Sequence, residues 1–175
     1  MQLTVEHFQA ARSGGAIHLF WEPQAARSIE LAVQGIARAL SFHYVLLPGH
    51  TTRDGARVRE RLGAAYEFPH HRPGHAETWD GVVDWLGDLT WLTSMATGPE
   101  RYKGFILPYR DPVVLFNNDA YEFAVLLDVL GHIGDRLGGD RPFHVVLGPL
   151  SDRRLSSFIT LLTVSENYCP VCQYP

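Results

Sequence analysis

Apolar and polar residues follow two different rhythms along this chain. Short, continuous apolar runs are typical of strands that are buried in a sheet. Longer segments repeat apolar residues every three or four positions, which is the period of an amphipathic helix. Strands are therefore expected at 16–21, 42–47, 112–116 and 143–147, with a shorter one at 104–107, and helices at 26–40, 54–65 and 120–137.

The alternation of strands and helices predicts the fold class. A helix that connects two strands returns the chain to the same edge of the sheet, so the strands run parallel. The sequence therefore predicts an α/β fold with helices packed on a small parallel sheet of three to four strands. We expect a strand-helix extension at 1–41, a main domain at 42–147, and a C-terminal extension and tail at 148–175.

An acidic segment occupies the middle of the chain, where Lys and Arg are absent from 73 to 100. Asp80, Asp84 and Asp88 are spaced four residues apart, so a helix would align them in one stripe. Thr78 is a suitable N-cap for that helix. Like charges at this spacing weaken a helix, so helix stability does not explain the stripe. A binding role is therefore favoured. A solvated helix face without a partner is the alternative interpretation.

The acidic segment resembles the signature of a known family. Residues 78–89, TWDGVVDWLGDL, resemble the motif of the barstar family, the protein inhibitors of bacterial ribonucleases. Gly74 matches the family's glycine, and Trp79, Asp80, Val82, Asp84 and Leu86 follow in register. Thr78, Gly81 and Trp85 stand where the family has Asn, Ala and Cys. The resemblance covers residues 42–147 and implies a barstar-like parallel sheet of three strands flanked by helices.

The resemblance also implies a function. The chain would be an immunity protein or antitoxin without enzymatic activity, and its acidic helix would imitate RNA phosphates in the active site of a basic ribonuclease. Carboxylates suit this role because they form strong, charge-assisted pairs with arginine. The expected partner-binding residues are Asp80 and Asp84 at the centre, Glu77 and Asp88 at the rim, and Gly74, Trp85, His71 and Asp135, the last two as counterparts of a family tyrosine and a family acid. No cofactor and no metal are expected.

The charge distribution agrees with a basic protein partner. The net charge of −4 is uneven, because residues 73–140 alone carry −7. An acidic middle segment favours a basic partner such as a nuclease toxin and argues against nucleic acid. A regulatory module that binds a protein other than a nuclease is an open alternative.

A metal site formed by histidine or cysteine residues is another alternative. His70, His71 and His75 lie close to Glu77 and Asp80, so a small metal-dependent enzyme is conceivable, although their spacing matches no familiar zinc motif. Cys169 and Cys172 form a single C-x-x-C pair. This pair supplies only two ligands, so zinc would need histidines or a second chain. We expect this tail to be disordered or packed on the domain.

Several classes of protein have no support in the sequence. A secretory signal is not expected at the N-terminus, and no apolar run reaches the roughly 18 residues that cross a membrane. With two cysteines in the chain, a cytoplasmic location is expected. Glycine-rich phosphate loops and G-x-S-x-G motifs are absent.

Overall fold

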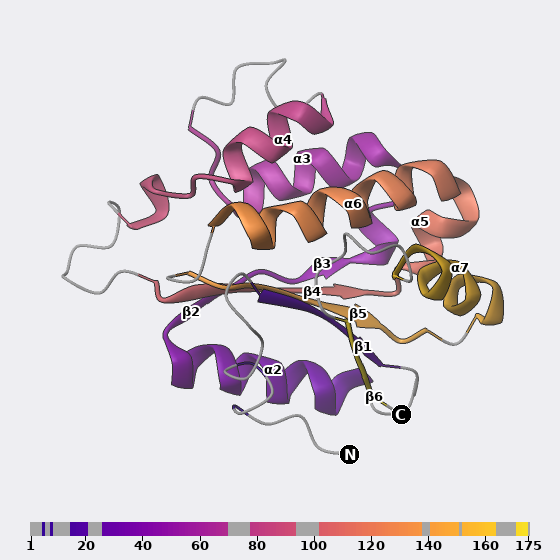
Figure 1. Cartoon of the computed structure of the whole chain (residues 1–175), viewed down its shortest axis with the longest axis horizontal. Coiled ribbons are helices and arrows are strands. Elements are labelled where there is room, and N and C mark those ends of the chain that lie inside the picture. Colours follow the sequence, from indigo (N-terminus) through magenta and orange to yellow (C-terminus); the bar gives the residue numbers. More distant parts are fainter. Residues whose placement is uncertain are drawn as a thin grey trace.

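A computed structural model provides the coordinates of the chain. It describes residues 5, 8, 15–20, 26–69, 78–93, 102–137, 141–150, 152–163 and 171–174. In this part of the chain, helices pack against both faces of a sheet whose paired strands are all parallel (Figure 1). The predicted α/β class with a parallel sheet is thereby confirmed.

The strand order of the sheet is β2-β4-β5-β1-β6, and β3 pairs with β4 beyond the end of β2. The bounds are β1 Gly15–Phe20, β2 Phe42–Tyr44, β3 Leu47–Pro48, β4 Gly104–Arg110, β5 Phe143–Gly148 and β6 Val171–Tyr174. β4 and β5 lie inside the sheet, and almost all their residues are buried. This explains their nearly continuous apolar sequences.

The helices form layers on the two faces of the sheet. α2, Ala26–Leu40, covers one face, and the other face is covered by α3, Gly55–Ala65, and α6, Ala120–Leu137, with α4, Trp79–Leu86, outside them (Figure 1). The remaining helices are α5, Val113–Asn118, and α7, Arg153–Thr163, with short 3-10 turns at Gly49–Thr51 and Trp91–Thr93. No helix in the described ranges is long and apolar enough to cross a membrane.

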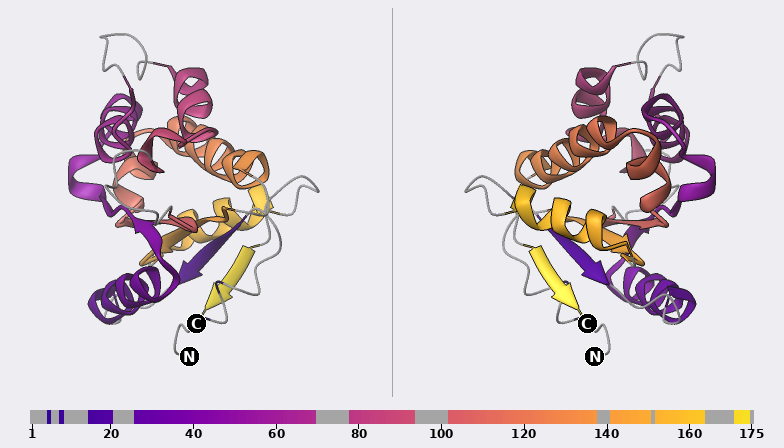
Figure 2. Two further views of the ribbon diagram at one scale, coloured as in Figure 1. Left: turned by 90° about the vertical axis from the view of Figure 1, so that its left-hand side faces the viewer. Right: turned by 90° about the vertical axis from the view of Figure 1, so that its right-hand side faces the viewer.

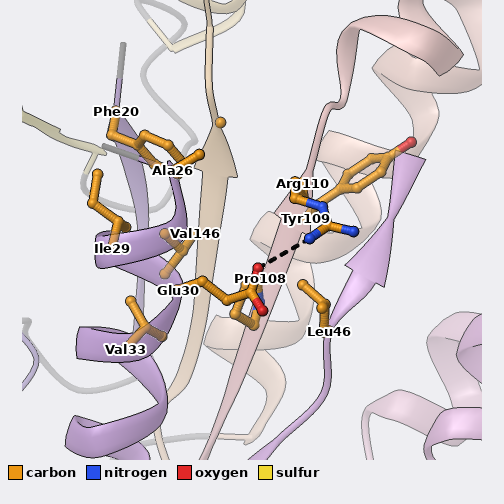
Figure 3. A pocket seen from close by; sticks show the side chains of 11 residues that line it. Phe20, Ala26, Ile29, Glu30, Val33, Leu46, Pro108, Tyr109, Arg110 and Val146 are labelled. Carbon is orange, nitrogen blue, oxygen red and sulfur yellow. Dashed lines mark hydrogen bonds and ion pairs between the residues drawn. The ribbon is translucent and has the colours of Figure 1, made fainter. Parts of the chain in front are cut away.

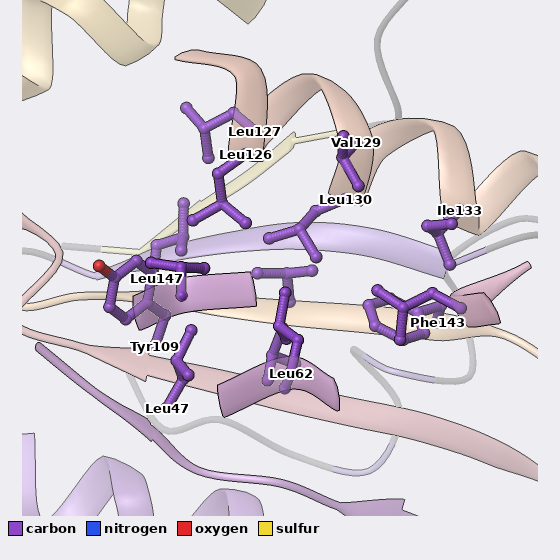
Figure 4. Packing of buried hydrophobic residues seen from close by; sticks show 14 of the residues in the cluster. Leu47, Leu62, Tyr109, Leu126, Leu127, Val129, Leu130, Ile133, Phe143 and Leu147 are labelled. Atoms are coloured by element: carbon purple, nitrogen blue, oxygen red, sulfur yellow. The ribbon is translucent and has the colours of Figure 1, made fainter. Parts of the chain in front are cut away.

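The layers enclose two apolar cores, one on each side of the sheet. The larger core lies under α3, α4 and α6, where Leu126, Leu130 and Ile133 of α6 point toward Phe143 and Leu147 of β5 (Figure 4). The smaller core lies under α2 and contains Val33 and Ile36. Amphipathic spacing along α2 and α6 thus positions both helices as the sequence pattern requires.

Two buried histidines stand out on the α2 side. His18 of β1 and His144 of β5 are both fully buried. Phe8 packs beside both rings, and Phe42 stacks on His144. Burial lowers the pKa of His144 to about 4, so this imidazole is neutral at pH 7.

One predicted strand is wrong. Residues 112–116 lie outside the sheet and mostly form α5, whereas the strand at this point of the chain is β4 at Gly104–Arg110. Only a short strand was expected at 104–107. Pro108 made the second half of β4 hard to predict, because proline lacks the backbone N–H that a strand residue donates and is rare inside sheets. The ladder on one side of β4 is interrupted between Tyr44 and Leu47, which pair with Ile106 and Tyr109 on either side of Pro108.

The two ends of the chain meet in the sheet. β1 lies between β5 and β6, so the predicted N-terminal and C-terminal extensions supply neighbouring strands (Figure 2). The division of the chain at residues 41 and 147 stays a prediction. The last described segment forms the strand β6 against β1.

Candidate functional site

The carboxyl ends of the strands and the starts of several helices meet at one edge of the sheet. We call this the carboxyl edge; it includes the ends of β1, β3, β4 and β5 and the first turns of α2, α3 and α7 (Figure 1). In open parallel sheets, ligands bind at this edge. Each helix also directs the positive end of its dipole and its unpaired backbone N–H groups there. The carboxyl edge therefore favours negatively charged ligands.

Five arginines lie at the carboxyl edge. Arg27 lies in the first turn of α2, Arg53 just before α3, Arg110 at the end of β4, and Arg153 and Arg154 in the first turn of α7. All except Arg110 are exposed. Because arginine presents a planar fork of donors, it suits phosphate groups better than a point charge does.

Some of these guanidinium groups are paired and others are not. Arg110 pairs with Glu30 at 3.2 Å, and Arg154 pairs with Asp152 at 2.9 Å. Within the described ranges, no ion pair involves Arg27, Arg53 or Arg153. Three exposed cations at the carboxyl edge are therefore available to an external anion.

A cavity lies just inside the carboxyl edge, between α2 and the ends of the central strands. Its volume is about 20 Å³, and its walls are mostly apolar, from Phe20, Ile29, Val33 and Val146 (Figure 3). Glu30 and Arg110, which form an ion pair, also line it. A cavity of this size holds about one water molecule, whereas ligand pockets measure about 300–1,000 Å³. The cavity is therefore too small for a nucleotide.

The Glu30–Arg110 pair influences a neighbouring tyrosine. Burial raises the pKa of Tyr44 to about 12; the Glu30 carboxylate adds to the rise and the Arg110 guanidinium opposes it. Tyr44 therefore keeps its hydroxyl proton to a higher pH than an ordinary tyrosine does.

The connection between β1 and α2 contains no glycine. Its sequence over residues 21–25 is WEPQA. Loops that cradle phosphates with backbone N–H groups depend on glycines at this position. A phosphate bound near α2 would therefore depend on side chains such as Arg27.

A shallow hollow of about 290 Å³ lies at the start of α3, lined by His50, Arg53, Asp54, Arg57, Glu60 and Arg61. Arg57 pairs with Glu60 at 2.7 Å, and both side chains are largely exposed. Asp54 is the N-cap and accepts a hydrogen bond from the backbone N–H of Arg57 at 2.8 Å. The hollow therefore extends from Arg53 at the carboxyl edge along the first turns of α3.

Replacing Asp54 by alanine is expected to lower the free energy of unfolding by about 1 kcal/mol, because the cap is lost. Asp54→Asn should leave stability nearly unchanged, since asparagine caps equally well. Urea denaturation of the two variants measures this difference. Equal losses in both would show that the charge, and not the cap, stabilises α3.

The structure places Asp80 and Asp84 on one exposed side of α4, capped as predicted by Thr78, whose hydroxyl accepts from the N–H of Gly81. Asp84 forms an ion pair with Arg136 of α6 at 3.2 Å, although 75% of its side chain is exposed. A role for these two carboxylates in binding a partner stays a prediction.

Of the other predicted binding residues, the structure describes the side chains of Asp88 and Trp85. Asp88 lies beyond α4, which ends at Leu86 with Gly87 as C-cap, so the expected stripe is shorter than predicted. Trp85 is half-buried and packs against Phe68 and Trp91. His71, Gly74 and Glu77 lie outside the described residues, as do His70, His75 and the side chain of Asp135.

The metal alternative gains no support from the described part of the chain, where no three His, Cys, Asp or Glu side chains gather in a metal-binding group. The predicted cluster at His70, His71 and His75 falls outside that part. The alternative of a metal-dependent enzyme therefore stays a prediction.

Comparisons with known proteins concern the fold. No family model and no curated protein matches the sequence. A structure of the Drosophila ORC bound to DNA matches with a TM-score of 0.52 and 14% identity, covering 97% of this chain and 28% of that chain. Cdc6p from Pyrobaculum aerophilum matches with a TM-score of 0.49 and 14% identity, covering 91% of this chain and 38% of that chain. The chain thus spans well under half the length of either protein.

This likeness corrects the barstar resemblance. The fold resembles that of the Drosophila ORC structure, and the match covers 97% of this chain instead of residues 42–147 alone. The predictions of a ribonuclease inhibitor, an immunity protein or antitoxin, a nuclease partner, no enzymatic activity and no nucleic acid are therefore wrong. The 12-residue motif misled because it records only an amphipathic acidic helix, which unrelated folds can carry.

Proposed function

We propose that the chain binds duplex DNA through its carboxyl edge, with Arg27, Arg53 and Arg153 contacting backbone phosphates. The observation that carries this proposal is the set of three exposed guanidinium groups beside the starts of α2, α3 and α7, none of which forms an ion pair with another described residue. Arginine side chains and helix N-termini are the two devices that proteins use most often to hold phosphate.

An extended polyanion fits this edge better than a nucleotide does. The cavity behind the edge has a volume of about 20 Å³, and no glycine occurs between β1 and α2. The exposed arginines instead lie at or just before the starts of three separate helices, so a ligand with several phosphates is needed to reach them together. A DNA strand supplies such a row of phosphates.

DNA is chosen among polyanions because a structural neighbour, the Drosophila ORC, is seen bound to it. The net charge of −4 does not exclude this partner, since residues 73–140 carry −7 and include the acids of α4 in an outer layer. The acidic residues of α4 would be repelled by the DNA and the arginines attracted to it, so the chain would bind with its carboxyl edge toward the DNA. A cytoplasmic location stays a prediction.

The test is binding of a short fluorescent DNA duplex, measured by anisotropy over a series of salt concentrations. Three phosphate contacts predict that log K falls against log salt with a slope of about −3, because each contact contributes about −0.9. An excess of ATP at the same ionic strength should not displace the duplex. A slope near zero, or displacement by equimolar ATP, would contradict the proposal.

A further inference from the structure

The hollow at the start of α3 brings together more arginines than the proposed DNA contact uses. Arg53, Arg57 and Arg61 are spaced four residues apart, and all three side chains are exposed and line the hollow. Arg57 and Arg61 are neighbours on one face of α3, since side chains at this spacing have their Cβ atoms about 5–6 Å apart. Like charges so close repel one another, and a negatively charged ligand would remove that repulsion.

Two acids also line the hollow, and each already has a partner. Asp54 accepts a hydrogen bond from the backbone N–H of Arg57 at 2.8 Å, so its carboxylate caps the helix. Glu60 pairs with the Arg57 guanidinium at 2.7 Å, and both side chains are largely exposed. An ion pair in solvent adds little stability, so a stronger anion can take Arg57 from Glu60. Arg61 forms no ion pair with another described residue.

The size and the charge of the hollow favour a compact dianion. Its volume of about 290 Å³ lies at the lower end of the range for ligand pockets, which is about 300–1,000 Å³. The three arginines outnumber the two acids by one charge, so the single charge of a phosphate diester gains little there. A phosphate monoester loses its second proton near pH 6, and it then presents three acceptor oxygens with nearly two negative charges. Such a group can bind two guanidinium forks at once.

We propose that the hollow binds a phosphate monoester, held by the guanidinium groups of Arg57 and Arg61. Glu60 weakens this binding, because it competes for Arg57 and its charge repels the phosphate. The monoester belongs either to the end of a DNA strand or to a small phosphorylated molecule, since both present the same group. The site does not depend on the proposed DNA contact, which uses neither Arg57 nor Arg61.

The first test adds inorganic phosphate to the full chain at about pH 7.5 and constant ionic strength. The phosphorus NMR line of the ligand broadens when it exchanges with a bound state, and this gives the affinity. Replacing Arg57 and Arg61 together by alanine should weaken binding at least about 10-fold, because the charge-assisted hydrogen bonds are lost. The matched control replaces Arg38 and Lys103, two exposed cations at the opposite edge of the sheet, and should bind like the wild type.

A second variant should bind phosphate more tightly than the wild type. Glu60→Gln removes the competing carboxylate from Arg57 and is expected to raise the phosphate affinity about 2- to 5-fold. Asp80→Asn, which removes an equal charge from an exposed position on α4, should leave the affinity unchanged. A gain of affinity cannot result from misfolding, so this variant tests the site independently of the arginine substitutions. An unchanged affinity in Glu60→Gln would contradict Arg57 as a ligand.

A short duplex with and without a 5′-phosphate identifies the source of the monoester. If the ligand is a DNA end, the 5′-phosphate should raise the affinity of the wild type at least about 10-fold, but hardly that of the double arginine variant. Equal affinities of the wild type for the two duplexes assign the site to a small phosphorylated molecule. The unphosphorylated duplex reports the proposed DNA contact separately, so either proposal can fail alone. The site is overturned if inorganic phosphate does not bind the wild type, or binds the double variant equally well.

Discussion

Replacing Gly49 by alanine is expected to lower the free energy of unfolding by about 3 kcal/mol. A Cβ at this position would overlap the carbonyl oxygen of Asp111 and lie 2.8 Å from that of Arg110. Both are backbone atoms at the end of β4, so neither can move without distorting the sheet. Urea denaturation followed by circular dichroism gives the change in the transition midpoint.

The same substitution at Gly35 is the matched control, with the opposite sign. Gly35 lies inside α2, and nothing lies within 4 Å of an added Cβ. Alanine there should raise the free energy of unfolding by up to about 1 kcal/mol, since it favours the helix over the unfolded chain. A Gly49→Ala variant as stable as Gly35→Ala would contradict the close packing of the 3-10 turn on β4.

Replacing Glu122 by alanine is expected to destabilise the fold by about 3 kcal/mol. The carboxylate of Glu122, on α6, accepts from Arg59 of α3 at 2.9 Å and from the indole N–H of Trp79 of α4 at 2.8 Å. Only 14% of the Arg59 side chain is exposed, so its charge would remain nearly buried without a partner. One acid therefore holds three helices together, and thermal or urea denaturation measures the loss.

Glu60→Ala is the control for an ion pair of the same kind in solvent. Glu60 pairs with Arg57 at 2.7 Å, and both side chains are about two-thirds exposed, at 63% and 60%. Its loss should change stability by less than about 1 kcal/mol, as for most surface pairs. Equal effects of Glu60→Ala and Glu122→Ala would refute the role assigned to burial.

The sequence predicts the long helices well because their apolar spacing is unambiguous. The bounds of α2 and α6 agree with the expected 26–40 and 120–137. Short apolar runs are ambiguous, since a strand and a single buried helical turn can share the same residues. The run at 113–116 forms a helix in which Leu115 is buried, and the strand that belongs there contains Pro108.

The candidate site was only partly accessible from the sequence. The exposed acids Asp80 and Asp84 follow from helical spacing, but this pattern does not reveal a partner. The arginines of the carboxyl edge follow their strands or open the next helix, as Arg27, Arg53 and Arg153 do. That they meet at one edge becomes clear only with the parallel strand order, which places these distant segments together.

The buried histidines illustrate the same limit. His18 and His144 are 126 residues apart, and each occurs in an apolar run that predicts nothing except a strand. The register between β1 and β5 brings them within hydrogen-bonding distance, because pairing is a property of the sheet and not of any one strand.

The central claim is that DNA binds at the carboxyl edge. Its most direct test compares two variants that each lose three positive charges, one at the carboxyl edge and one at the opposite edge of the sheet. One variant replaces Arg27, Arg53 and Arg153 by alanine. Its control replaces Arg38, Lys103 and Arg141, which lie at the end of α2 and before β4 and β5, on the opposite edge. We predict that the first variant loses at least about 100-fold in duplex affinity and nearly all of the salt dependence, while the control stays close to wild type. Equal losses in the two variants, or none in the first, would contradict the account.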